Sequence, residues 1–353
     1  MKIITIVGAR PQFIKAAALS REIAKHKTIE EIIIHTGQHF DDNMSEVFFR
    51  EMEIPKPKYN LAIHSLNHGA MTGRMLEEIE KLLIIEKPNL LLVYGDTNST
   101  LAGALAAKKL HIKVAHVEAG LRSFNMEMPE EINRILTDRI SDFLFCPTQT
   151  AVDNLKKEGY ENIACKIFRS GDVMQDAANY YALKSEKNTN IDYNNFILCT
   201  LHRAENTDDS KKLAIIIEAL NEIHKSTPVV LPLHPRTKKK IIDLNIALKV
   251  KIIDPIGYLE MIDLLKRCSL VMTDSGGLQK EAYFFKKNCV TLRDQTEWVE
   301  LINNDVNILS KIDKEQIINS VKVMQERKPN FSIDLYGNGK ACENILNELL
   351  KIN

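Results

Sequence analysis

Short apolar runs alternate with longer amphipathic stretches through the first half of the chain. The runs are continuously apolar, which is typical of parallel strands buried on both faces of a sheet. The stretches between them carry apolar residues at the spacing of a helix. Strands are therefore expected at residues 2–7, 31–36, 90–94, 114–117 and 143–147, with an edge strand at 163–170, and helices at 14–24, 43–52, 68–85, 99–110, 130–140 and 151–158.

A polar segment at residues 185–195 has no apolar periodicity and is the expected linker between two domains. The alternation restarts after it, with strands expected at 196–201, 229–233, 250–253, 270–273 and 288–292, and helices at 211–225, 237–244, 259–266, 314–324 and 341–350. This order predicts an α/β protein with two Rossmann-like doubly wound domains facing a cleft, at 1–180 and 190–335, and a closing helix within 336–353. Ligands bind beyond the carboxyl ends of the strands in such sheets.

Composition narrows the class of protein. A chain of 353 residues is long enough for about two domains that each bury a core. Lys+Arg and Asp+Glu are both 47, and this balance disfavours a nucleic-acid binder that depends on a diffuse basic surface. The six cysteines form no CxxC pair, which favours reduced core thiols over a zinc site. We recognise neither a signal peptide nor a membrane-spanning run, so a soluble cytoplasmic protein is expected.

The segment VMTDSGGLQKE at 271–281 combines a strand end with the start of a helix. Gly276 and Gly277 allow a ligand to approach the backbone, and the first amides of a helix favour phosphate, as does the hydroxyl of Ser275. Glu281, one turn later, is placed to accept hydrogen bonds from the hydroxyls of a ribose. The alternative is a plain strand–turn–helix, because SGG alone is a weak signal.

The turn after the first strand carries two cations but lacks the known nucleotide-binding patterns. Arg10 and Lys15 follow a single glycine, with neither the G-x-G-x-x-G of a dinucleotide site nor the G-K-[ST] of a P-loop. An epimerase that oxidises its substrate transiently would need bound NAD, so that class is disfavoured. Each cation considered alone fits equally well as an ordinary surface residue.

Acidic residues follow three strands or loops at one predicted edge of the first sheet. Asp96 lies at the tip of the strand at 90–94, Glu118 follows the strand at 114–117, and Glu130 begins a helix after Pro129. Carboxylates at strand tips are positioned for proton transfer, because burial there can raise their pKa. The alternative is helix capping for Asp96, and dipole compensation in the first helical turn for Glu130 and Glu131.

Two His-Arg pairs follow strands of the second domain. His202 and Arg203 come directly after the strand at 196–201, and His234 is followed two positions later by Arg236. A lone histidine at a strand end is usually an ordinary hydrogen-bonded loop residue. Here two such pairs are expected on the same sheet edge as Ser275-Gly276-Gly277. That arrangement favours a site that holds a diphosphate.

With these segments in view, the chain resembles the non-hydrolysing UDP-N-acetylglucosamine 2-epimerases. The resemblance rests on GARPQFIK (8–15), TGQH (36–39), YGDTNST (94–100), HVEAGLR (116–122), PEEINR (129–134), HRAEN (202–206) and TDSGGLQKEA (273–282). It implies the glycosyltransferase type B fold, a last helix that packs back on the first domain, and a homodimer. It also implies a catalytic set of Lys15, Asp96, Glu118, Glu130 and His202, UDP held by Arg10, Ser275, Gly276, Gly277 and Glu281, and uracil flanked by residues from Ile256 to Met261.

Several positions depart from the pattern of the UDP-N-acetylglucosamine enzymes. GARPQF stands in place of GTRPE, HRAEN in place of HRREN, and Trp298 where arginine is common, while the loop before Pro129 is shorter. These features are similar to the branch that acts on UDP-2,3-diacetamido-2,3-dideoxyglucuronate. UDP-N-acetylglucosamine stays the principal hypothesis and the uronate the alternative. The C6 carboxylate of the uronate would need an extra cation or donor, and the candidates are Arg74, Arg122, Arg236 and the indole of Trp298. The family's regulatory site corresponds to positions near Gln38, Arg74 and His234, but Asp41 differs from the usual residue there.

The chemistry implied by the resemblance needs neither cofactor nor metal. The C2 proton of a 2-acetamido sugar is not adjacent to a carbonyl, so its removal is expected to accompany departure of UDP from C1. The result is a glycal intermediate, to which UDP adds again after C2 is protonated on the opposite face. The rival classes are a hydrolysing 2-epimerase, a type B glycosyltransferase and a binding protein without turnover.

Overall fold

The computed structural model describes residues 1–38, 53, 56–185, 191–193 and 195–352, except the side chain of Arg10. The backbone divides into two compact units. The first comprises Met1–Ala177 and Asp334–Asn353, and the second comprises Ala178–Ile333. Each unit is built on one parallel sheet covered by helices, which confirms the expected fold class of two Rossmann-like α/β domains.

The first unit has a seven-stranded sheet in the order β3-β2-β1-β4-β5-β6-β7. The chain winds outward from β1 through β2 to β3, then returns to the other side of β1 with β4. The carboxyl ends of β1 and β4 therefore meet where the winding changes direction, which is the usual ligand position in this fold. The strands are β1 (Lys2–Val7), β2 (Glu30–His35), β3 (Tyr59–Asn60), β4 (Leu90–Tyr94), β5 (Lys113–Val117), β6 (Phe143–Cys146) and β7 (Lys166–Arg169).

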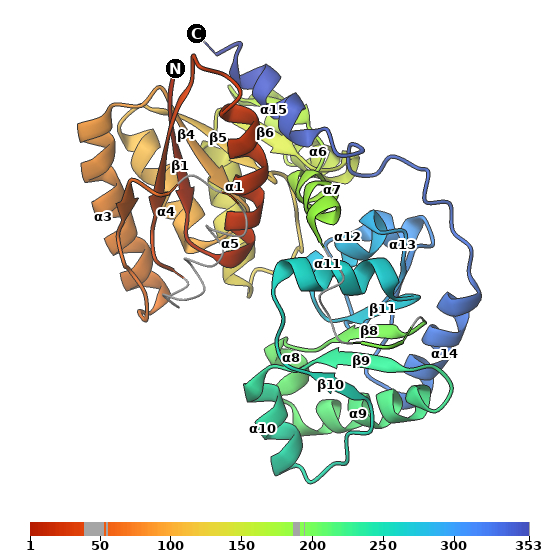
Figure 1. Ribbon diagram of the computed structural model, residues 1–353. Helices are drawn as coiled ribbons and strands as arrows, with labels where there is room; N and C mark the ends of the chain where they lie inside the picture. Colours follow the sequence, from red (N-terminus) through yellow and green to blue (C-terminus); the bar gives the residue numbers. More distant parts are fainter. Residues whose placement is uncertain (39–52, 54–55, 186–190, 194, 353) are drawn as a thin grey trace. The chain divides into compact units, whose positions relative to one another are not determined.

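Helices cover both faces of this sheet because its central strands β1, β4, β5 and β6 are buried on both sides. Ile4 and Ile6 of β1 share a core with α3 and α4, while α1 packs against α15 (Figure 1). The helices of this part are α1 (Arg10–Ile23), α3 (His68–Glu86), α4 (Asn98–Lys109), α5 (Pro129–Ile140), α6 (Gln149–Lys157), α7 (Val173–Lys184), which continues into the second unit, α15 (Ala341–Leu349), and the short 3-10 turn η1 (Tyr160–Asn162).

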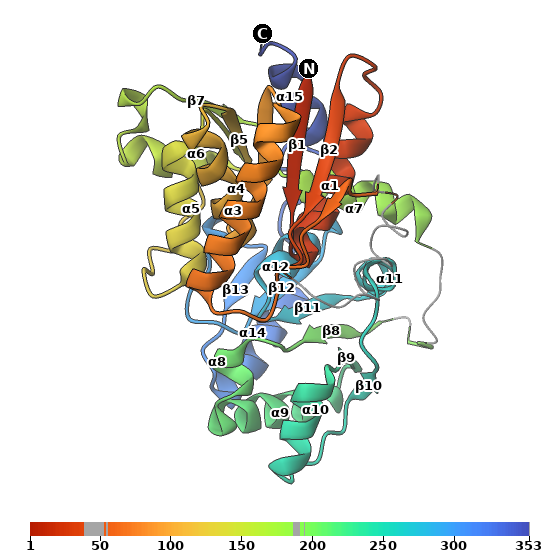
Figure 2. The same cartoon turned by 90° about the vertical axis from the view of Figure 1, so that its left-hand side faces the viewer.

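The second unit repeats the scheme with six strands in the order β10-β9-β8-β11-β12-β13 (Figures 1 and 2). Ile197 of β8 faces a core formed with α9 and α14, and the next residue, Leu198, faces α11 and α12. Its elements are β8 (Ile197–Thr200), α8 (Ala204–Thr207), α9 (Ser210–His224), β9 (Val229–Pro232), α10 (Pro235–Asp243), β10 (Lys251–Ile253), α11 (Tyr258–Arg267), β11 (Leu270–Thr273), α12 (Gly276–Phe284), β12 (Asn288–Thr291), α13 (Val299–Asn303), β13 (Asn307–Leu309) and α14 (Lys314–Glu326).

The pattern of the sequence did not predict every element. The short elements β3, α8, α13 and β13 were missed, as was the twelve-residue helix α7. The helix expected at 43–52 lies outside the described residues, as does most of the linker segment at 185–195.

Docking of α15 in the first unit gives a prediction about stability and pH. The carboxylate of Asp176 accepts the amides of Ala341 and Cys342 at 3.0 and 3.2 Å, and burial raises its pKa to about 6 although these hydrogen bonds lower it. A raised pKa in the folded state means that the stabilisation is complete below the unfolded value near 4 and is lost as the pH rises through about 6. Asp176→Asn should therefore gain stability relative to the unmodified chain between pH 4.5 and 7.5, by on the order of 2 kcal/mol, in urea denaturation. A difference that does not change with pH would contradict this prediction.

Candidate functional site

Lys15, one of the two predicted cations, meets two of the predicted acids at the carboxyl edge of the first sheet. Lys15, on α1, is buried, and its Nζ forms an ion pair with the carboxylate of Glu118, which follows β5. The pair lies over Gly95, since an added Cβ there would be 3.2 Å from Nζ of Lys15 and 3.4 Å from Oε2 of Glu118. Asp96 is the next residue. The turns after β4 and β5 thus bring opposite charges to one place.

The backbone of Glu118 has an uncommon conformation. Its φ is +73°, in the left-handed region, where a residue with a side chain costs roughly 1–2 kcal/mol. The amides of Glu118 and Ala119 both donate to the carbonyl of Phe145, at 3.0 and 3.1 Å, and so hold the turn. Strain of this kind at a strand tip is a frequent feature of functional sites.

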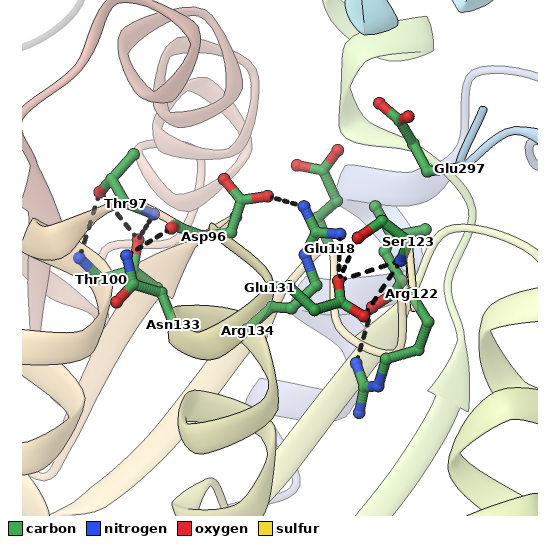
Figure 3. A network of polar contacts seen from close by, with 12 residues as sticks. Asp96, Thr97, Thr100, Glu118, Arg122, Ser123, Glu131, Asn133, Arg134 and Glu297 are labelled. Carbon is green, nitrogen blue, oxygen red and sulfur yellow. Dashed lines mark hydrogen bonds and ion pairs between the residues drawn. The ribbon is translucent and has the colours of Figure 1, made fainter. Parts of the chain in front are cut away.

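Asp96 is held by an ion pair and is not a helix cap. The N-cap of α4 is Thr97, whose hydroxyl accepts the amide of Thr100, so the capping alternative for Asp96 is wrong. The carboxylate of Asp96 instead pairs with Arg134, which also binds Glu131 at 2.7 Å (Figure 3). Arg134 therefore fixes the position of the Asp96 carboxylate.

Glu131 is a structural residue of the loop that precedes α5. Its buried carboxylate accepts the amides of Ser123 and Phe124 at about 3.0 Å, together with the hydroxyl of Ser123 (Figure 3). Its predicted role in compensating the helix dipole is therefore secondary to holding this loop. Glu130, by contrast, is exposed in the first turn of α5.

Gln12 connects two turns of the site, a role that its sequence position does not predict. Its Oε1 accepts the amides of Gly8 and Ala9 at 2.9 and 3.0 Å, and its Nε2 donates to the carbonyl of Tyr94 at 2.8 Å. The side chain is buried. The amide thus ties the turn after β1 to the turn that carries Asp96.

Arg122 is fully engaged inside the first unit, so its expected role as a cation facing a substrate is wrong. Its guanidinium binds Asp138 at 2.7 Å and both oxygens of Glu158, and its side chain is 1% exposed. Asp138 also binds His116 at 2.7 Å, and Nε2 of His116 contacts the carbonyl of Gly95 at 2.7 Å. Burial alone would raise the pKa of Asp138, but His116 and Arg122 together hold it below its usual value.

In the second unit, one buried carboxylate organises the segment after β8. Asp274 follows β11, is 0% exposed, and accepts the amides of His202 and Arg203 at 3.2 and 3.0 Å. Its Oδ1 lies 3.4 Å from Nδ1 of His202, whose side chain is 53% exposed. Nδ2 of Asn206 adds a third donor at 3.3 Å. The pattern of the sequence does not distinguish Asp274 from the other residues of this turn.

The segment at 271–281 folds as expected, with a strand, a turn and then α12. Ser275 is the N-cap residue, and its amide donates to the hydroxyl of Thr273 at 2.9 Å. Gly276 is buried, Gly277 is exposed, and Glu281 lies one turn later with 7% exposure. The helix start therefore presents bare backbone at Gly277.

A later segment of the second unit packs against this helix start. An added Cβ on Gly276 would lie 2.3 Å from Oε1 of Glu297, and the ring of buried Trp298 is 3.9 Å from Nζ of Lys280. Arg293 binds Glu297 at 3.2 Å. Trp298 is thus a packing partner of α12 and Lys280.

The other predicted ligand residues of the second unit lie on neighbouring elements. His234 is the exposed N-cap of α10, and Arg236 binds Asp208 at 2.8 Å, so this second His-Arg pair is partly committed to an internal ion pair. Ile256 and Met261 are half-buried against the core under α11 and α12. The side chain of Arg10 and the position Asp41 lie outside the described part of the chain.

The described part of the chain shows neither a metal-binding cluster nor a membrane-spanning helix. Within the described residues, no group of three or more His, Cys, Asp or Glu side chains is arranged to hold a metal ion. None of the described helices combines the length and the apolar character needed to cross a membrane.

Comparison with known proteins gives matches over the whole chain. A family model described as UDP-N-acetylglucosamine 2-epimerase matches residues 21–350. The chain is 58% identical, over the full length of both proteins, to the UDP-2,3-diacetamido-2,3-dideoxy-D-glucuronate 2-epimerase of Pseudomonas aeruginosa. It is 46% identical to the UDP-N-acetylglucosamine 2-epimerase of Methanocaldococcus jannaschii, with 98% of each chain covered.

Solved structures agree in fold. The Methanocaldococcus jannaschii enzyme in complex with UDP-GlcNAc and UDP gives a TM-score of 0.89 at 46% identity, covering 99% of each chain. The Neisseria meningitidis UDP-GlcNAc 2-epimerase bound to UDP-GlcNAc gives 0.90 at 32% identity, covering 99% of this chain and all of the other.

Proposed function

The chain belongs to the UDP-N-acetylglucosamine 2-epimerase family, and from that premise we propose that it inverts C2 of a UDP-2-acetamido sugar by elimination and re-addition of UDP. The observation that carries the proposal is the convergence of Lys15, Glu118 and Asp96 around the turn at Gly95. A site of this kind supplies the proton-transfer groups that the reaction needs.

The proposed reaction has two steps that mirror each other. In the first, a base removes the C2 proton while the bond from C1 to the UDP oxygen breaks and its electron pair leaves with UDP. The C2 electron pair forms the C1–C2 double bond of a glycal. In the second, an acid delivers a proton to the opposite face of C2 and the UDP oxygen bonds again to C1. Neither an oxidant nor a cofactor enters this balance.

We assign the residues of the two units to different parts of the substrate. Asp96, Glu118 and Glu130 with Lys15 in the first unit, and His202 in the second, act on the sugar. Ser275, Gly276 and Gly277 bind the diphosphate, with Arg10, Arg203 and His234 as further donors, Glu281 accepts from the ribose, and Ile256 and Met261 flank the uracil. Support comes from the bare backbone at the start of α12 and from the motif positions shared with the family.

For the sugar, we propose the 2,3-diacetamido uronate, with UDP-GlcNAc as the second candidate. The relative that is 58% identical over its full length is named for the uronate, whereas the UDP-GlcNAc enzyme from Methanocaldococcus jannaschii is 46% identical. Trp298, which departs from the UDP-GlcNAc pattern, is buried beside Lys280, so this departure is part of a packed structure and not a free surface change.

We also propose that the enzyme works in the cytosol as a homodimer. All six cysteines are free thiols, which fits the reducing cytosol. A homodimer is the assembly that the family resemblance implies.

Two of the positions that correspond to the family's regulatory site lie in the described part of the first unit. Gln38 binds Ser99 at 2.7 Å, and Arg74 is exposed.

One experiment tests both the chemistry and the sugar. Both UDP-sugars are incubated together with the enzyme in D2O and followed by proton NMR. We expect deuterium at C2 of the product, because the abstracted proton exchanges before re-addition. We also expect the uronate to be consumed preferentially, by about tenfold to a hundredfold, since one charge-assisted contact to its C6 carboxylate contributes roughly 1.5–3 kcal/mol.

Each alternative outcome has a separate meaning. A product with only protium at C2 would exclude the elimination route, and release of free sugar with UDP would identify a hydrolysing enzyme. Preferential use of UDP-GlcNAc would reject the uronate but leave the mechanism standing. Turnover that depends on an added acceptor would point to a glycosyltransferase, and binding of either sugar without any turnover to a binding protein.

A further inference from the structure

The geometry points to Asp274 as the residue that positions His202 for proton transfer. We infer that the Asp274 carboxylate holds the His202 imidazole in the tautomer with its proton on Nδ1, so that Nε2 is the atom offered to the substrate. This inference rests on the proposed function for the role of His202, but its first test does not depend on activity.

The strands bring the two residues together. β8 and β11 are neighbours in the second sheet, with Thr200 paired to Thr273 at their carboxyl ends. The residue directly after β11 therefore lies beside the segment that follows β8. The hydroxyls of Thr200 and Thr273 are 2.6 Å apart, which fixes the register of the two ends below the site.

The environment of Asp274 is that of a buried carboxylate that acts only as an acceptor. It is 0% exposed, and donors reach it from the amides of His202 and Arg203 and from Nδ2 of Asn206. Asn206 is itself fixed by a second hydrogen bond, 3.0 Å long, to the carbonyl of Leu292. These donors hold the carboxylate of Asp274 in one orientation.

The tautomer follows from this arrangement. Nδ1 of His202 lies 3.4 Å from Oδ1 of Asp274, and a carboxylate oxygen can only accept. A neutral imidazole in this position therefore places its proton on Nδ1 and its lone pair on Nε2. The side chain is 53% exposed although Asp274 is buried, so one edge of the ring meets the carboxylate and the rest remains open. Orientation of a histidine by a buried carboxylate is a recurrent arrangement in acid–base catalysis.

Asp274 could alternatively serve only to hold the turn, because it accepts two main-chain amides. Asp274→Asn separates the two roles. The side-chain oxygen of asparagine still accepts the amides, but its NH2 group is a donor. If Nδ1 also carries a proton, two donors face each other and this tautomer is destabilised. A purely structural role predicts no change at the His202 ring.

The test is long-range 1H–15N NMR of the full chain labelled with 15N-imidazole histidine. The chain has ten histidines, and His202→Gln assigns the signals of His202 by their loss. We expect the Nδ1–H tautomer in the unmodified chain and a shift of population toward Nε2–H in Asp274→Asn. Thr200→Val is the matched control, since it removes the hydrogen bond between the hydroxyls of Thr200 and Thr273 without touching the carboxylate of Asp274, and it should leave the tautomer unchanged.

Activity supplies the second readout. In Asp274→Asn, kcat should fall by at least about a hundredfold while the Kd for UDP changes less than threefold. Adding His202→Gln to Asp274→Asn should then cause little further loss, because the two residues act as one unit. An Nε2–H tautomer in the unmodified chain, or an unchanged tautomer in Asp274→Asn, would overturn the inference. The Nδ1–H tautomer in a chain without epimerase activity would instead overturn the proposed function and leave the positioning by Asp274 intact.

Discussion

Replacing Glu118 by Gln should lower kcat by about a hundredfold or more while leaving the fold in place. Glutamine has nearly the same shape, and its side-chain oxygen can still accept from Nζ of Lys15, the ion-pair partner of Glu118. What it cannot do is take up a proton at neutral pH. The loss therefore reports proton transfer rather than a disrupted turn.

The measurement is kcat for epimerisation together with the Kd for UDP and the thermal midpoint. We expect the Kd and the midpoint to change little, because the proposed UDP ligands lie on α12 and the segment after β8. Glu161→Gln is the matched control, since its side chain in the first unit is 66% exposed and lies on η1, away from the carboxyl edge of the sheet. Turnover of Glu118→Gln at the control's rate would return Glu118 to a structural role with Lys15.

The sequence predicted the sheet strands and the long helices because burial on both faces imposes continuous apolar runs. β1, β4 and β11 are such runs, and each lies where it was expected. The two-residue strand β3 and the five-residue helix α13 are too short to leave a periodic pattern, so they were missed. α7 was missed for another reason: its first turn carries the half-buried Asp176, which interrupts the apolar face of the helix.

The sequence pattern predicted the charged residues of the site, but it did not predict the groups that hold them in place. Glu118 and His202 are polar residues that directly follow apolar runs, and this pattern can be recognised in the amino-acid sequence. The partners of such residues are fixed by tertiary distance: Gln12 reaches Tyr94 across 82 positions and Asp274 reaches His202 across 72. A buried acceptor for main-chain amides looks in sequence like any turn residue, so neither pairing could be read from the pattern.

Partners that are distant in sequence also explain why the prediction for Arg122 was wrong. It follows Glu118 closely, and proximity in sequence suggested proximity in function. The structure turns its guanidinium into the core, where Asp138 and Glu158 neutralise it. The Arg122 side chain is only 1% exposed, so a position near a strand tip does not by itself place a charged residue at the site.

Gly277→Val should abolish most UDP binding without destabilising the chain. An added Cβ at Gly277 meets nothing within 4 Å, so valine fits the chain by itself. Its branched side chain would nevertheless occupy the space through which a diphosphate must approach the first amides of α12. Loss of one charge-assisted hydrogen bond weakens binding by about tenfold to a hundredfold.

Gly277 is a better position for this test than Gly276. Valine at Gly276 would first displace Glu297, whose Oε1 lies 2.3 Å from the added Cβ and whose carboxylate binds Arg293, and the result would mix two effects. Gly73→Val is the control for a new side chain on a helix, because Gly73 of α3 also has open space around its Cβ. Calorimetric titration with UDP should give an unchanged Kd for Gly73→Val and a Kd raised at least tenfold for Gly277→Val, with the thermal midpoint of Gly277→Val within a few degrees of the unmodified chain. Equal UDP affinity in Gly277→Val and the unmodified chain would show that the diphosphate does not bind at the start of α12.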